Sequence, residues 1–472
     1  MSPAGGWGRR RLAAGLRWLG PWRVGGPTAH RLGTVLAVSL VWDVALTVDG
    51  RVPAVLLPVA VVATVALYPA LTLTCLAALR SPPAGWIARR RPERLLSVAP
   101  ALLLLLLALV AAQLPGRLRP TAPVQDDETA ATVCAAQDVL RGHDPYRTPE
   151  LACLNRLHAS VLIATPLQAG PFARVRTYPT ATQLRRAARA ARGSGYHTDA
   201  FWSFDYPPMA FVWMLPAALG GHAGWVAWTM LAALGWAVFV LRLSGAWWPA
   251  VGSILLLQWG DGSVLGAASQ GDGEFFAFAL TALGLVLLDR PRRSALCLGL
   301  ALATNPLPWV LLPGYALLAA TLPHPRRRLS WLAGTVVAVV LPWLLVYRGA
   351  ATDILAFLHQ LTFSDGAGLT ALGVLHLGLP PSRTAMFALF ALGSLALLAL
   401  GALRRPYRAA VPAVAVAAFW LSWRSNANYL AQLPLWAAAV AIGLDRLQRR
   451  TPMTDRPSTG ASPVPAPPLA AS

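Results

Sequence analysis

Apolar segments long enough to cross a lipid bilayer recur along the whole chain. The run SVAPALLLLLLALVAAQL at residues 97–114 is the plainest of them. A helix of roughly 20 apolar residues crosses the hydrocarbon core of a membrane. Backbone polar groups must be hydrogen-bonded internally in lipid, and the chain lacks the alternating pattern of a β-barrel, so these segments are predicted to be helices. The sequence therefore predicts an all-α, multi-pass membrane protein.

The composition supports this class and argues against a nucleic-acid-binding protein. Hydrophobic residues make up 56% of the chain and charged residues only 12%, which is about half the charged share of a soluble domain. The mean hydropathy is +0.53. The net charge is +21, and every fixed cation is an arginine because the sequence contains no lysine. Most of these arginines lie in short loops, where they set membrane topology, so no nucleic-acid partner is expected.

The arginine clusters predict which loops face the cytoplasm, because cytoplasmic loops of membrane proteins are enriched in positive charge. The result is a basic cytoplasmic N-terminus at 1–31 and a membrane domain at 32–446, with a long extracytoplasmic loop at 115–205. A disordered cytoplasmic tail follows at 447–472. The protein is expected in the plasma membrane. The clusters used are Arg9–Arg31, Arg89–Arg94, Arg290–Arg293, Arg326–Arg328, Arg404–Arg408 and Arg446–Arg450.

About ten to twelve membrane helices are predicted from the apolar segments. The glycine-rich run 249–271 is expected to be re-entrant or interfacial. The next span, 274–289, must begin outside the cytoplasm if it ends inside at Arg290, and a full crossing by 249–271 would place its start on the wrong side. Residues 294–322 are interrupted by NPLP at 305–308 and are expected to form two short helices that enter the membrane and return. The other spans are expected near 32–48, 53–79, 95–114, 223–243, 274–289, 330–347, 384–402, 409–423 and 428–444.

The long loop contains two further features. Cys134 and Cys153 are its only cysteines, and outside the cytoplasm two such residues can form a disulfide; the sequence leaves open whether they pair. Residues 181–192 form a basic amphipathic pattern that predicts a helix, either lying on anionic lipid headgroups or presenting an ordinary solvated face.

Several polar groups are brought to the extracytoplasmic face by this topology. Polar and ionisable residues at membrane depth are costly and mark functional sites. The candidates are Asp126 to Glu128, Asp205, Tyr206, Gln270 to Glu274, His359, His376 and Arg424 to Tyr429, which include Asp127, Asp272 and Asn428.

Each candidate group also has a purely structural interpretation, and the residues alone do not decide between the two. The acids Asp126–Glu128 would suit a helix N-terminus, and the prolines after Tyr206 would suit a first helical turn. The segment SQGDGE (269–274) would form a glycine-rich turn whose Asp272 and Glu274 begin the next helix. His376 would be a hydrogen-bonded buried or interfacial histidine, and Arg424 would extend its charge to the membrane surface.

In this order, five segments resemble polytopic glycosyltransferases of the GT-C superfamily, and in particular glycosyltransferase family 87, which uses polyprenyl-phosphate mannose. Together they span much of residues 120–440. The segments are AAQDVLRGHDPY (135–146), SFDYPPMAFVWMLPAAL (203–219), SQGDGEFFAFALTALGLVLL (269–288), LCLGLALATNPLPWVLLPGYAL (296–317) and SNANYLAQLPLW (425–436).

The resemblance implies a GT-C-like fold and an inverting sugar transfer. It implies a catalytic base in the first large extracytoplasmic loop, for which Asp127 is preferred, with Asp126 and Glu128 as alternatives. Asn305 stands where the family commonly has a lysine, so Arg424 or another extracytoplasmic arginine is expected to bind the lipid phosphate. The expected substrate-binding residues are Tyr146, Asp205, Tyr206, Gln270, Asp272, Asn305, His376, Arg424, Asn428 and Tyr429.

The expected function is therefore transfer of a sugar, most readily mannose, from a polyprenyl-phosphate donor to a lipid or glycan acceptor outside the cytoplasm. Membrane lipids are the surrounding partners. No cofactor is required by this chemistry, although clustered carboxylates are able to bind a divalent metal ion. The alternative is a polytopic transporter or lipid flippase for cell-envelope precursors, since such proteins also contain broken helices and polar groups at mid-membrane depth.

Overall fold

The computed structural model describes a chain that is helical along most of its length. The described residues are 26–49, 56–80, 93–117, 127–161, 164, 167, 172, 175–194, 204–257, 259, 263–360, 365–366, 368–369, 371, 383–422, 424–425 and 427–450. A single pair of two-residue strands occurs within these ranges, in which β1 (Asp365–Gly366) pairs in parallel with β2 (Arg424–Ser425).

Seven helical segments among the described residues are long and apolar enough to cross a membrane. They confirm the prediction of a helical, multi-pass membrane protein. In one of them the apolar stretch continues past α9, through the short helix η6 (Gly245–Trp247), to the end of α10 (Trp248–Leu257). The long helices are α2 (Pro27–Asp49), α3 (Leu57–Leu79), α4 (Glu93–Arg117), α9 (His222–Ser244), α15 (Pro325–Val346), α18 (Arg383–Leu403) and α20 (Ala427–Arg450).

The number of full-length spans in the described residues is smaller than the predicted ten to twelve. The difference lies in apolar stretches that glycine and proline divide into short helices, because proline lacks an N–H and ends or bends a helix. The run 249–271 is divided between α10 and α11, and 294–322 is broken near Asn305 as predicted. The short elements are α11 (Val264–Gln270), α12 (Glu274–Val286), α13 (Pro291–Leu302), η7 (Leu307–Leu311), α14 (Leu312–Ala319), α19 (Val411–Val414) and η9 (Ala415–Leu421).

Helix α20 forms the centre of the packed bundle. It lies against α2, α3, α10 and α12, and its Trp436 is fully buried. The Tyr68 hydroxyl of α3 donates to the Leu430 carbonyl oxygen at 3.1 Å, and the Thr28 hydroxyl of α2 donates to Asp445 at 2.9 Å. The long helix α20 is therefore fixed near both of its ends by the first two helices.

Helices α4, α15 and α18 have the opposite character, since large apolar side chains lie exposed along them. Leu104 of α4 is 69% exposed, Leu345 of α15 is 71% exposed and Leu392 of α18 is 61% exposed. Contiguous exposed apolar surface on this scale is costly in water and suits contact with lipid. These helices therefore form the lipid-facing wall of the bundle.

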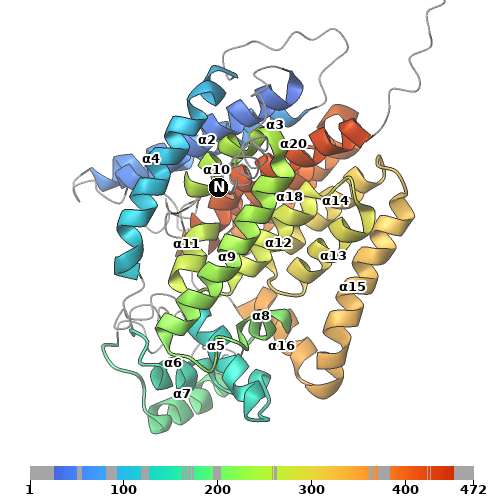
Figure 1. Cartoon of the computed structure of the whole chain (residues 1–472). Helices are drawn as coiled ribbons and strands as arrows, with labels where there is room; N and C mark the ends of the chain where they lie inside the picture. The colour runs from blue at the N-terminus through green and yellow to red at the C-terminus, as the bar shows by residue number, and fades with distance from the viewer. Residues whose placement is uncertain are drawn as a thin grey trace, which may run out of the picture.

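The segment between α4 and α9 gathers at one end of the molecule, together with the helix that follows α15 (Figure 1). Helix α7 confirms the helix that was predicted at 181–192. The elements at this end are α5 (Asp127–Leu140), η2 (Pro145–Arg147), α6 (Glu150–Arg156), α7 (Ala181–Ser194), α8 (Met209–Met214) and α16 (Ala350–Gln360).

Both ends of the membrane region differ from the predicted boundaries. Helix α2 begins at Pro27, inside the predicted basic N-terminus, and α20 continues to Arg450, inside the predicted tail. Arg31 is buried within α2 rather than lying in a loop. Residues 1–25 of the predicted basic N-terminus (1–31) and residues 451–472 of the predicted disordered tail (447–472) lie outside the described residues.

Candidate functional site

A chain of hydrogen bonds joins four polar side chains that are far apart in the sequence. The Asn305 amide nitrogen Nδ2 donates to Glu128 Oε1 at 3.1 Å and to Glu274 Oε1 at 3.1 Å. The Asn428 Nδ2 donates to the second oxygen, Oε2, of Glu274 at 2.9 Å. Glu128, Asn305, Glu274 and Asn428 are called the acid–amide cluster below.

The orientation of Asn305 within the cluster is fixed by the backbone. Its Oδ1 accepts from the backbone N–H of Leu307 at 2.8 Å, at the start of η7. The oxygen is therefore occupied, and the NH2 group, which has two donors, faces the two carboxylates. The NPLP sequence thus builds a turn whose asparagine bridges Glu128 and Glu274.

Glu128 reaches the cluster from the first turn of α5. An acid in the first turn of a helix is favourable because the helix dipole is positive there, and the first turn of α5 contains both Asp127 and Glu128. Asp127 is buried, at 9% exposed. Asp126 lies outside the described residues. The choice of Asp127 as base stays a prediction, while Glu128 is the acid that contacts Asn305.

The glycine-rich turn before α12 delivers Glu274. Gly271 has a φ of +84°, and a Cβ at this position would lie 3.1 Å from Cβ of Trp225, so the turn requires glycine on both grounds. Asp272 Oδ1 accepts from the backbone N–H of Glu274, the first residue of α12, at 2.8 Å. Gln270 ends α11 and is half-buried. The predicted role of Asp272 in substrate binding stays a prediction.

Glu274 is one of the polar residues expected at the extracytoplasmic face, but the sequence assigned it no role in the site. In the structure it makes two hydrogen bonds in the cluster, as many as Asn305. Glu274 is only 4% exposed, and both oxygens of its carboxylate accept hydrogen bonds from asparagines. Such an acid at the start of an otherwise apolar helix is costly to bury unless it is hydrogen-bonded. The sequence does contain a sign of this role, because Glu274 directly precedes the apolar run FFAFALTALGLV.

Tyr206 lies beside the cluster and keeps its phenolic proton. Burial foremost, and then the negative charges of Glu128 and Asp205, raise the pKa of the Tyr206 phenol well above its ordinary value. Tyr146 supports this segment, since its hydroxyl donates to the Tyr206 carbonyl oxygen at 3.0 Å. Asp205 is buried directly before Tyr206. The YPP stretch thus both starts α8 and brings a neutral phenol donor to the acids.

The raised pKa of Tyr206 predicts that this residue contributes no phenolate signal when the protein is titrated with alkali. A free tyrosine ionises at about pH 10. Tyr206 is expected to stay protonated through that range, because its phenolate would be buried beside carboxylates. Wild type and Tyr206→Phe should therefore give the same phenolate absorbance up to pH values at which the protein remains folded. One additional phenol titrating near the ordinary value in wild type would contradict the placement of Tyr206.

A mainly apolar cavity of about 270 Å³ adjoins this cluster. The polar residues of its wall are Tyr206, Glu274, Asn305, Ser394, Ser422 and Tyr429. The rest comes from η7, α14, α18, α19 and η9, whose side chains are almost all apolar. These lining residues are Leu307, Trp309, Val310, Phe387, Phe390, Leu397, Leu398, Val411, Ala415 and Phe419. The cavity therefore combines a mainly apolar wall with the buried acid Glu274 and several hydrogen-bonding side chains.

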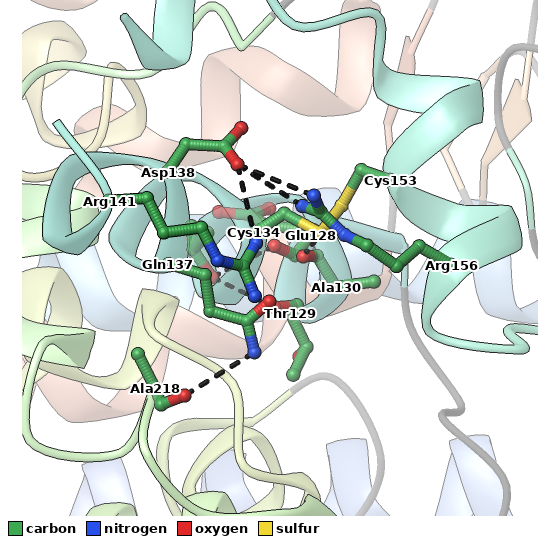
Figure 2. Close-up of a disulfide and its surroundings, with 11 residues drawn as sticks. Glu128, Thr129, Ala130, Cys134, Gln137, Asp138, Arg141, Cys153, Arg156 and Ala218 are labelled. Carbon is green, nitrogen blue, oxygen red and sulfur yellow. Dashed lines mark hydrogen bonds and ion pairs between the residues drawn. A yellow bond between two sulfur atoms is a disulfide. The ribbon is translucent and has the colours of Figure 1, made fainter. Parts of the chain in front are cut away.

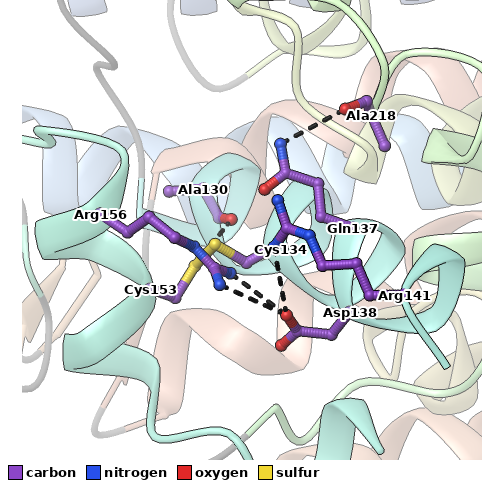
Figure 3. A network of polar contacts seen from close by, with 8 residues as sticks. All are labelled: Ala130, Cys134, Gln137, Asp138, Arg141, Cys153, Arg156 and Ala218. Carbon is purple, nitrogen blue, oxygen red and sulfur yellow. Dashed lines mark hydrogen bonds and ion pairs between the residues drawn. A yellow bond between two sulfur atoms is a disulfide. The ribbon is translucent and has the colours of Figure 1, made fainter. Parts of the chain in front are cut away.

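Helix α5, which positions Glu128, is bound covalently to α6. Cys134 and Cys153 form a disulfide with a Cα–Cα distance of 6.0 Å, which settles the pairing that the sequence left open (Figure 2). Asp138 of α5 accepts from Arg156 of α6 at 3.3 Å. Gln137 donates to the Ala218 carbonyl oxygen at 3.3 Å, on the other side of α5 (Figure 3). Three kinds of contact therefore hold this helix in place.

The remaining expected site residues are placed less completely. Arg424 lies in β2, shortly before α20 and its Asn428, and its side chain is outside the described part of the chain. His376 is outside the described residues altogether. Tyr429 lines the cavity and packs against Phe419, with ring centroids 5.1 Å apart. Over the described ranges, no group of three or more His, Cys, Asp or Glu side chains is arranged to hold a metal ion.

Comparison with known proteins returns no relative: no protein-family model, no curated protein and no solved structure matches the chain. Function must therefore be argued from the site itself.

Proposed function

We propose that this chain is a membrane glycosyltransferase that moves a sugar from a polyprenyl-phosphate donor to a lipid or glycan acceptor. The observation that carries the proposal is the cavity, which is apolar over most of its wall and is also lined by Glu274, Asn305 and Tyr206. A polyprenyl-phosphate sugar has the matching form, with a long apolar chain and a head rich in hydroxyls. Mannose is the first sugar to test, because of the resemblance to the mannose-transferring family.

In this proposal Glu128 is the general base. An acceptor hydroxyl gives its proton to the Glu128 carboxylate while its oxygen forms a bond to the anomeric carbon. The bond from that carbon to the phosphate oxygen breaks, and the lipid phosphate leaves with the electron pair. One displacement inverts the anomeric centre. Glu128 is preferred to Asp127 because it is the acid hydrogen-bonded to Asn305, which lines the cavity.

The other cluster residues orient the sugar in this scheme. Glu274 is held by two asparagines, so its carboxylate is rigid and suited to accept from sugar hydroxyls. The protonated phenol of Tyr206 is a donor toward the leaving group or the sugar ring, which is where preorganised donors stabilise developing charge. Arg424 is proposed to bind the phosphate, because arginine offers a planar fork of donors that fits phosphate.

A single assay separates an enzyme from the alternative, a transporter or lipid flippase. Purified protein in vesicles receives polyprenyl-phosphate mannose, radiolabelled in the sugar, and a mixture of lipid acceptors. A glycosyltransferase is expected to convert the label into a new glycolipid and release polyprenyl phosphate. Recovery of unchanged donor on the opposite leaflet, with no labelled product, would contradict the proposal and identify a transporter.

The apolar wall provides a second test. Val310→Trp places a large side chain into the cavity wall and is expected to lower transfer from a long-chain donor by about tenfold, equivalent to about 1.4 kcal/mol. Transfer from a donor with a short chain should fall less. The matched control is Val337→Trp on α15, where the valine is 55% exposed and faces lipid. Equal effects of the two substitutions would show that the donor chain does not occupy this cavity.

A further inference from the structure

An open basin lined by arginines lies where α13, α15 and α20 meet. Its volume is about 510 Å³, and its wall consists of Arg290, Pro291, Arg292, Arg293, Arg327 and Arg450. These residues come from the starts of α13 and α15 and the end of α20. The start of α15 is the end remote from α16, so the basin lies on the side of the molecule away from α5–α7 (Figure 1). It is therefore separate from the acid–amide cluster.

The charge of the basin is only slightly compensated by the described carboxylates around it. Asp289 is the nearest acid, and its buried side chain already binds Arg446 through two hydrogen bonds, at 3.1 and 3.0 Å. Arg450 also contacts it at 2.8 Å. One carboxylate thus serves several arginines, while Arg293 and Arg327 stay exposed. Guanidinium groups gathered on a concave surface form a binding site for phosphate, which they bind through paired hydrogen bonds.

The basin is built by buried contacts and is not a chance meeting of flexible side chains. Arg328 is 1% exposed, and it donates to the Leu288 carbonyl oxygen at 2.8 Å and the Pro323 carbonyl oxygen at 3.0 Å. These bonds fix the start of α15 against the end of α12. Because α13 also packs along α15, the arginines at the starts of both helices are held on the same rim.

Apolar surface directly beside the basin indicates a lipid rather than a soluble anion. Trp331 is 45% exposed, Leu329 is 37% exposed and Leu296 is 48% exposed. The Arg292 guanidinium lies 5.3 Å from the centre of the Trp331 ring. A tryptophan that contacts both polar groups and apolar surface is typical of the membrane–water interface. A headgroup phosphate in the basin would therefore leave its acyl chains along α13 and α15.

We propose that this basin binds the phosphate headgroup of an anionic phospholipid. Basic pockets between membrane helices bind such headgroups in general, and here the cations, the concave shape and the flanking apolar surface occur together. The proposal is independent of the glycosyltransferase function, since it concerns the opposite end of the molecule. It assigns the protein a specific lipid partner in addition to the bilayer.

Native mass spectrometry of the full chain in detergent, titrated with phosphatidylglycerol or phosphatidylcholine, tests the proposal. Wild type should bind phosphatidylglycerol more tightly, and Arg293→Gln with Arg327→Gln should weaken that binding by roughly tenfold or more. The matched control is Arg404→Gln with Arg405→Gln, two exposed arginines outside the basin. Circular dichroism checks that each variant is folded, and excess inorganic phosphate serves as the soluble competitor.

Three results would overturn the lipid assignment. They are unchanged phosphatidylglycerol binding in the basin variant, equal weakening in the control variant, and displacement of the lipid by inorganic phosphate. The second would show a general effect of surface charge, and the third would show a site for soluble phosphate.

Discussion

Glu128→Gln is expected to lower sugar transfer by about 10²- to 10⁴-fold, the usual contribution of a general base. Glutamine has nearly the same shape and keeps an acceptor oxygen for Asn305 Nδ2, so the hydrogen bond at 3.1 Å in wild type can persist. The fold and the binding of donor should then change little. The measurement is the initial rate of labelled glycolipid formation, together with the melting temperature.

Two further variants provide a control for this result and a test of the alternative base. Asp353→Asn changes a half-buried acid on α16, at the same end of the molecule, and should leave transfer near the wild-type rate. Asp127→Asn tests the neighbouring acid that the sequence favoured. Loss of transfer in Asp127→Asn with normal transfer in Glu128→Gln would assign the base to Asp127 and refute the role proposed for Glu128.

Removal of the disulfide, by Cys134→Ser with Cys153→Ser, is expected to have the largest effect on stability. A cross-link across a sequence separation of 19 restricts the unfolded chain and contributes about 3 kcal/mol in the loop-entropy description. Because the bond holds α5 against α6, its loss should also loosen the helix that carries Glu128. The melting temperature and the transfer rate should both fall.

Cys297→Ser is the matched control, since Cys297 is a partly buried free cysteine of α13. It should melt close to wild type. Reducing agent should lower the melting temperature of wild type and leave the double variant unchanged. A double variant as stable as wild type would show that the bond contributes nothing to the fold.

The long helices were predictable because hydropathy alone determines them. The leucine run of α4 can only be a helix in a membrane, because its backbone groups must be hydrogen-bonded internally. The helix spans Glu93–Arg117, which encloses the predicted span 95–114. The region around α10 to α12 was harder, since glycine lowers helix propensity and buried short helices have the same composition as full spans. Hydropathy alone therefore does not distinguish a full span from a short apolar helix in this region.

The site was predictable in its parts but not in its connections. Adjacent residues on a helix point about 100° apart, so the sequence could not decide between Asp127 and Glu128 without the orientation of α5. Likewise, the pairing of Cys134 with Cys153 depends on how α6 folds back on α5. Asn305 was expected from the resemblance to the family, but its double contact to Glu128 and Glu274 follows only from the tertiary fold.

The central claim is that the cavity holds the lipid donor with its sugar at the acids. The most direct test is an experimental structure of the protein with a non-reactive polyprenyl-phosphate sugar analogue. We predict that the chain lies between α14 and α18, that the sugar contacts Glu274, and that the Glu128 carboxylate faces the anomeric carbon. A bound analogue with its chain elsewhere, or with its sugar directed away from Glu128 and Glu274, would contradict the account.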